Sequence, residues 1–105
     1  MEILSPKELK AIRRNASEAA SMLRVLSHEA RLSVLCDLAA GERSAGALVE
    51  SSGLSQSALS QHLAKLREEG VVATRRDGQT IFYRLADGRA ARLIGVLHEL
   101  YCERK

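Results

Sequence analysis

The chain has 105 residues, a formal net charge of +3 and a sequence pI near 9.2. This length fits one domain with a real but small core, to which a partner surface would add stability. The mild positive charge permits nucleic-acid binding without establishing it, because 16 basic residues are mixed with 13 acidic ones. No apolar run approaches the roughly 20 residues of a membrane span, and a signal peptide is not evident at the N-terminus. We therefore expect one cytoplasmic domain over residues 1–105, with no membrane partner.

A long first helix is expected from Ser5 to about Leu26. Ser5, Pro6 and Glu8 combine an N-cap, a proline at the first helical position and a capping-box glutamate. Apolar side chains recur along this segment at alternating spacings of three and four residues, at Leu9, Ile12, Ala16, Ala19, Leu23 and Leu26. Such a narrow seam suits close packing of helices, either within the chain or between two copies.

The next helix, SHEARLSVLCDLAAG, carries the first of two cysteines. Cys36 shares an apolar face with Leu32, Leu35 and Ala39, so its simplest interpretation is a small core residue.

Two short helices joined by a turn follow. The first opens at Ser44, a good N-cap, and is broken by Gly53. Ser55 can cap the second, whose Leu59, Leu63 and Leu66 form one buried stripe. This spacing predicts a helix-turn-helix.

The face opposite the leucine stripe is small and polar. Serine and glutamine can donate and accept hydrogen bonds at base edges, and lysine neutralises phosphate. We assign DNA contacts on this helix to Ser55, Gln56, Ser57, Ser60, Gln61, His62 and Lys65. His62 flanks the stripe, so partial packing and a phosphate contact are both open for it.

A β-hairpin follows Gly70, because VVATRR and TIFYRL flank Asp77-Gly78, a dipeptide typical of tight turns. Arg75, Arg76 and Gln79 would bring charge and polarity at its tip to phosphates or a minor groove. A solvated basic turn is the alternative for the arginines alone, but the preceding helix pair favours DNA binding. The chain thus predicts a mainly α winged helix-turn-helix with about five helices and a β-hairpin wing.

The last helix, roughly Asp87 to Cys102, is apolar over more than one face. We expect it to join the first helix in a two-fold homodimer interface that sets two recognition helices about one DNA turn apart on an inverted repeat. The expected interface residues, here called the dimer seam, are Leu9, Ile12, Ala16, Ala19, Leu23, Leu93, Leu97, Leu100 and Tyr101.

Cys102 ends this helix beside His98 and near Arg104 and Lys105, surroundings that could favour thiolate and oxidation; an incidental surface thiol is the alternative. The expected reducing compartment disfavours a structural disulfide, and the lack of a C-x-x-C pair argues against thioredoxin-type exchange or a zinc ribbon.

The helix order and the stretches LSHEARL, SQSALSQHLAKLREEGVV and RRDGQTIFYRL resemble the ArsR family of bacterial repressors over essentially the whole chain. The two cysteines and the final LYC resemble its dithiol subgroup, which includes the BigR, SqrR and HlyU regulators. The resemblance implies a dimer that binds operator DNA, and that responds to reactive sulfur species or oxidants when Cys36 and Cys102 become bridged by a disulfide or polysulfide. It leaves open whether the role is repression or relief of silencing.

The alternative function is a zinc-responsive repressor, with His28, His62, His98, Cys36 and Cys102 as potential ligands. The metal sites of the family are incomplete here. One site type needs a C-x-C in the first helix of the pair, but this segment reads SAGALVE and has no cysteine. A second type needs D-x-H with further ligands thirteen and sixteen residues after the aspartate. Counted from Asp87, Arg89 and Leu100 stand where ligands are needed, and only Glu103 fits. A DNA-independent interaction module shares the fold.

No nucleophile elbow, H-E-x-x-H or phosphate loop is present, so we expect no enzyme, catalytic residue, cofactor or bound metal.

Overall fold

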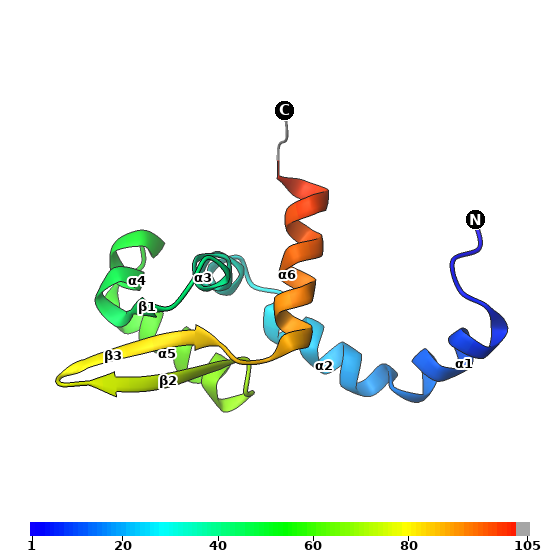
Figure 1. Cartoon of the computed structure of the whole chain (residues 1–105), viewed down its shortest axis with the longest axis horizontal. Coiled ribbons are helices and arrows are strands. Elements are labelled where there is room, and N and C mark those ends of the chain that lie inside the picture. Colours follow the sequence, from blue (N-terminus) through cyan, green and yellow to red (C-terminus); the bar gives the residue numbers. More distant parts are fainter. Residues whose placement is uncertain (103–105) are drawn as a thin grey trace.

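A computed structural model describes residues 1–102 as helices and strands in the order of a winged helix-turn-helix (Figure 1). The elements are α1 (Pro6–Arg14), α2 (Ala16–Leu26), α3 (Glu29–Ala39), β1 (Arg43–Ser44), α4 (Ala45–Ser52), α5 (Gln56–Glu68), β2 (Val72–Asp77), β3 (Thr80–Leu85) and α6 (Gly88–Tyr101). The predicted fold class is confirmed. Within the described range, no helix is both long and apolar enough to cross a bilayer.

The expectation of one long helix up to Leu26 is wrong, because the helix breaks at Asn15 and the chain has six helices in the described range rather than about five. The Asn15 side chain donates from Nδ2 to the Ala11 carbonyl at 3.1 Å, and its backbone leaves helical geometry with φ −109° and ψ 16°. Asparagine competes in this way with the helical backbone for hydrogen bonds. Figure 1 shows that α1 consequently turns away from the axis of α2. The predicted capping box at Ser5 and Glu8 is present.

One core holds α3, α4, α5, the wing and the base of α6 together. It is entirely aliphatic and comprises Val25, Leu26, Val34, Leu35, Leu38, Leu48, Leu59, Leu63, Leu66, Val71, Val72, Ala90 and Ile94. The predicted leucine stripe of α5 lies within it, with exposed fractions of 1%, 3% and 0%. Burial of a leucine side chain contributes about 1.5–3 kcal/mol, so this stripe fixes which face of α5 turns outward.

Local signals position the two helices of the motif. Ser44 accepts a hydrogen bond from the Ala47 amide at 3.1 Å, and Ser55 accepts one from the Ala58 amide at the same distance. Gly53 ends α4 in the left-handed region with φ 73°, a conformation that favours glycine. The predicted caps and turn are therefore confirmed.

The wing is an antiparallel sheet in the order β1-β3-β2. Asp77 pairs with Thr80 around Gly78, whose φ is 65°, as the hairpin prediction requires. The sequence did not indicate β1, which is only two residues long and pairs Arg43 with Tyr83. This strand fastens the loop before α4 to the wing.

Candidate nucleic-acid interface and dithiol groove

The outward face of α5 is open to solvent and polar. Its predicted DNA-contacting residues are exposed, with the exception of His62, and they are Ser55, Gln56, Ser57, Ser60, Gln61 and Lys65. Lys65 forms an exposed ion pair with Glu69 at 3.4 Å, which does not prevent it from meeting a phosphate, because such a pair is weak in water. Small side chains along this face allow close approach of the helix backbone to a groove.

His62 is held from within the protein. Arg31 of α3 donates from Nε to His62 Nδ1 at 3.3 Å, and the His28 ring lies with its centroid 4.5 Å from that of His62. Burial, followed by the charges of His28 and Arg31, lowers the pKa of His62. Of the two interpretations left open by the sequence, partial packing describes this arrangement, while a phosphate contact stays a prediction.

The two wing arginines are not equivalent. Arg75 donates from Nε and Nη2 to the two carboxylate oxygens of Glu42, both at 2.8 Å, and its guanidinium carbon lies 4.4 Å from the Phe82 ring centroid. The hydrogen bond from Arg75 lowers the pKa of Glu42. Arg76 and Gln79 are exposed at the tip. Sequence reasoning missed Glu42, because no local pattern relates residues separated by 33 positions.

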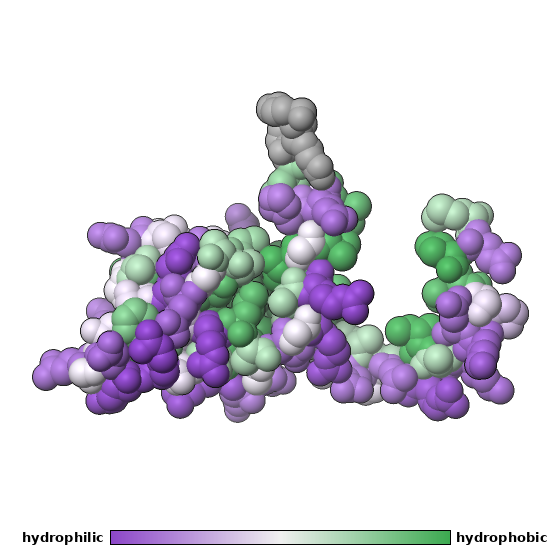
Figure 2. All heavy atoms as spheres, in the orientation of Figure 1, coloured by the Kyte–Doolittle hydropathy of each residue, from purple (hydrophilic) through white to green (hydrophobic). Residues whose placement is uncertain are grey.

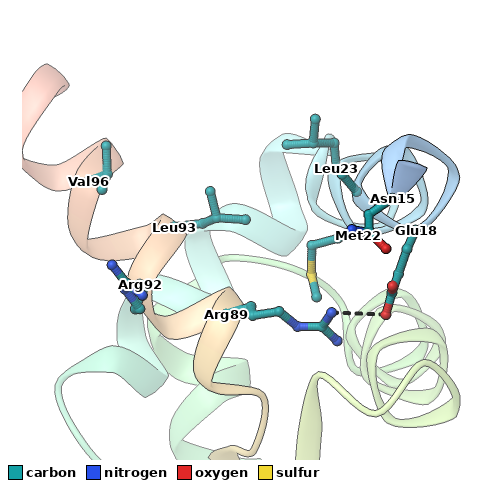
Figure 3. A pocket seen from close by; sticks show the side chains of 9 residues that line it. Asn15, Glu18, Met22, Leu23, Arg89, Arg92, Leu93 and Val96 are labelled. Carbon is teal, nitrogen blue, oxygen red and sulfur yellow. Dashed lines mark hydrogen bonds and ion pairs between the residues drawn. The ribbon is translucent and has the colours of Figure 1, made fainter. Parts of the chain in front are cut away.

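Large apolar side chains are exposed on α1, α2 and α6, and Figure 2 shows hydrophobic atoms at the surface of α1 and of α6 as separate patches. None of the nine dimer-seam residues is buried, and the exposed fraction is 39% for Leu9, 57% for Leu23 and 68% for Leu100. A hollow of about 440 Å³ separates α2 from α6 (Figure 3). Met22, Leu23, Leu93 and Val96 line it, and the Arg89–Glu18 ion pair at 3.0 Å lies at one side.

The two cysteines line one apolar groove between α3 and α6, of about 660 Å³, which we call the dithiol groove. Its other lining residues are Leu32, Ala39, Leu85, Ala91, Ile94, Gly95, Leu97, His98 and Tyr101. Cys36 is exposed, so the expectation that it is a core residue is wrong; the core position is taken by its neighbour Leu35. Cys102 lies at the C-cap of α6, and both thiols are free.

Electrostatics connects the two thiols. Although Cys36 is exposed, the groove partly shields its thiol from water and so raises its pKa, and the charges of Cys102 and Asp37 raise it further. Cys36 therefore carries little thiolate at neutral pH, and a negative charge on Cys102 disfavours its ionisation further. Arg104 and Lys105, which the sequence placed near Cys102, lie outside the described residues.

Potential metal ligands do not gather. Among residues 1–102, no group of three or more histidine, cysteine, aspartate or glutamate side chains is arranged to hold a metal ion. His28 and His62 approach each other without a third ligand, and Glu103 lies outside the described residues.

Known proteins match this fold and its sequence. Residues 28–74, from the start of α3 to the first half of β2, match the family model described as "Bacterial regulatory protein, arsR family". The transcriptional activator HlyU of Vibrio cholerae is 43% identical over 99 residues, covering 94% of this chain and 92% of HlyU. The chain belongs to the ArsR family.

Other ArsR-family members agree along nearly the whole chain. The biofilm growth-associated repressor of Agrobacterium fabrum is 48% identical over 90% of this chain and 80% of that protein. The crystal structure of the repressor BigR from Xylella fastidiosa superposes with a TM-score of 0.86 at 42% identity, covering 90% of this chain and 97% of that one. The predicted resemblance is thus confirmed, and ArsR-family membership makes the chain a DNA-binding transcription regulator rather than an enzyme.

Proposed function

We propose that this ArsR-family protein is a homodimeric repressor that binds an inverted-repeat operator and is released when reactive sulfur species or oxidants bridge Cys36 and Cys102. The proposal that the protein binds DNA rests on α5, which has one buried apolar face and one exposed polar face. Leu59, Leu63 and Leu66 anchor one side in the core, and the exposed side presents serine, glutamine and lysine. One relative is named a repressor and another an activator; we assign repression, because a dimer bound over a promoter blocks polymerase without needing any further surface.

The dimer is supported by the exposed seam. Leu9, Ile12 and Leu23 on the α1–α2 arm and Leu100 on α6 remain in solvent in a single chain. Several large apolar side chains exposed in this way are characteristic of a protein interface. A two-fold axis through the seam would place one α5 on each side and match two half-sites about 34 Å apart.

The sulfur chemistry assigns a different step to each thiol. Cys102, exposed at the end of α6, attacks the outer sulfur of a persulfide RSSH, which breaks its S–S bond and expels RS⁻. Cys36, whose raised pKa keeps it protonated, loses its proton as it attacks the persulfidated Cys102 and expels HS⁻. The sum is two thiols plus RSSH giving a disulfide, RSH and H₂S, with the persulfide as the two-electron oxidant.

Bridging would couple the groove to DNA binding through α3. This helix packs against both helices of the motif, α4 and α5, and also against α6. A covalent link between α3 and the end of α6 therefore restrains the recognition helix relative to the dimer seam. A coupling of about 1–3 kcal/mol would lower operator affinity by a factor of roughly 5 to 150.

Selection from a pool of randomised DNA duplexes tests the DNA-binding function. The reduced protein should enrich an inverted repeat, and its affinity should fall steeply with salt concentration. Replacement Gln61→Ala on the exposed face should weaken binding to the enriched duplex about tenfold, the size of one lost base contact, whereas Glu68→Gln near the end of the same helix should not. Failure to enrich any duplex would contradict the proposal.

A further inference from the structure

Arg31 connects three helices, and it meets the recognition helix near its middle, at His62. It lies in the first turn of α3 and is partly buried. Its Nη1 donates to the Val25 carbonyl, in the last turn of α2, at 3.1 Å, and its Nε donates to His62 Nδ1 on α5 at 3.3 Å. A guanidinium presents its donors in a rigid planar fork, so these two bonds fix the direction of His62 relative to the α2–α3 corner. The leucine stripe sets which face of α5 turns inward, and the two bonds add a directional restraint on His62 that burial alone does not supply.

His28 lies beside the His62 ring, which stays partly exposed. It is the N-cap of α3, where its Nδ1 accepts a hydrogen bond from the Ala30 amide at 3.1 Å, and its ring is tilted by 58° against that of His62. The bond from Arg31 requires a lone pair on His62 Nδ1, which only the neutral imidazole with its proton on Nε2 provides. Protonation would turn Nδ1 into a donor facing another donor and would place a second positive charge against Arg31.

We propose that Arg31 is a positioning residue that sets the recognition helix through neutral His62, and that protonation of His62 weakens discrimination between the operator and other DNA. This inference rests on the proposed function, since it requires that α5 reads an operator. His62 then acts within the protein and not primarily as a phosphate contact.

The charges around His62 are few. Burial lowers its pKa first, and the charges of His28 and Arg31 add to this effect, so the ring is neutral at neutral pH. Within the described residues, α4 and β2 also pack against α5 but contribute no charge to this shift, and α2 supplies only the Val25 carbonyl to the Arg31 bridge. Acidification through the ordinary histidine pKa of about 6.5 and below it therefore opposes the bridge.

The experiment uses the reduced full-length protein and two fluorescent duplexes: the one enriched by selection and a scrambled duplex of the same composition. The measured quantity is the ratio of the two affinities, which cancels the general gain in DNA attraction from added positive charge. For the unmodified protein, this ratio should fall several-fold between roughly pH 8 and pH 5.5, with about tenfold as the upper limit, because one group with an ordinary pKa of about 6.5 supplies no more than one pH unit of linkage over that range. Arg31→Lys should lower the ratio at every pH, because one ammonium cannot reproduce the fork.

Two histidine variants identify the titrating group. His62→Asn retains an acceptor near the position of Nδ1 but does not titrate, so the pH dependence of the ratio should disappear. His28→Asn retains an N-cap side chain, and the pH dependence should remain.

Three outcomes would overturn the inference. They are a ratio that does not change with pH in the unmodified protein, pH dependence that survives in His62→Asn, and a ratio for Arg31→Lys equal to that of the unmodified protein. In each case, an enriched duplex that still binds would leave the proposed function standing. If no duplex is enriched, the proposed function fails and this inference fails with it.

Discussion

Arg75 of β2 and Glu42 of the loop before β1 form a two-point ion pair, with both N···O distances at 2.8 Å. The same guanidinium lies over the Phe82 ring. An arginine that is neutralised in this way by its own protein is a poor candidate for a phosphate contact, and its geometry instead ties β2 to the loop before α4. Arg76 is therefore the wing arginine that we expect to contact a DNA phosphate.

Replacement of each wing arginine by alanine should separate these roles. Arg76→Ala should reduce the slope of log affinity against log salt by about 1, the value for one lost phosphate contact. Arg75→Ala should leave the slope nearly unchanged and should speed amide hydrogen exchange along β2 and β3, since the link to Glu42 is gone. Equal salt slopes for the two variants would contradict the assignment.

Dimerisation can be tested at one position of the seam. Leu23 is 57% exposed in the single chain, so Leu23→Glu should leave the monomer folded while burying a charge in any dimer. Analytical ultracentrifugation at micromolar concentration should give twice the chain mass of 11.5 kDa for the unmodified protein and the chain mass itself for the variant. Ser17→Glu, also exposed on α2 but outside the seam, is the matched control and should stay dimeric. A monomeric unmodified protein would refute the proposed dimer.

Asp87 gives a prediction about acid stability. It caps α6 by accepting from the Arg89 amide at 2.8 Å and the Ala90 amide at 3.4 Å. Burial alone would raise its pKa, but the hydrogen bonds from the Arg89 side chain and from these amides together lower it. Because the folded pKa is depressed, the stabilisation is complete above the ordinary aspartate pKa of about 3.9 and is lost as the pH falls through the folded value.

Urea unfolding of Asp87 variants measures this contribution. Asp87→Ala should lower the free energy of unfolding at neutral pH by about 1 kcal/mol, the usual cost of a lost N-cap. Asp87→Asn should keep most of the cap and show a smaller loss of stability on acidification than the unmodified protein. An acid dependence identical in all three proteins would show that Asp87 does not titrate in the expected way.

The features predicted well from the sequence are those with local causes. Ser44 and Ser55 cap the helices that follow them, Gly53 and Gly78 adopt the positive φ angles that turns require, and the spacing of leucines on α5 defines its buried face. Each depends on residues within a few positions of one another. The fold class and the outward face of the recognition helix follow from them.

The features not predicted depend on packing between distant segments. The Arg75–Glu42 pair and the Arg31–His62 bond join residues 33 and 31 positions apart, for which a single sequence offers no pattern. Helical periodicity placed Cys36 on an apolar face but did not reveal that this face borders an open groove. The break at Asn15 has a local cause, but the apolar spacing of three and four residues continues across it and so predicted one unbroken helix.

The central claim is that a bridge between Cys36 and Cys102 releases DNA, and the most direct measurement combines intact mass and affinity for the enriched duplex before and after treatment with glutathione persulfide. The unmodified protein should gain an intramolecular disulfide or polysulfide and lose affinity by roughly 5- to 150-fold. Cys36→Ser and Cys102→Ser should bind the duplex when untreated and should not be released. Equal release of either single variant, or a bridged protein whose affinity is unchanged, would contradict the dithiol switch.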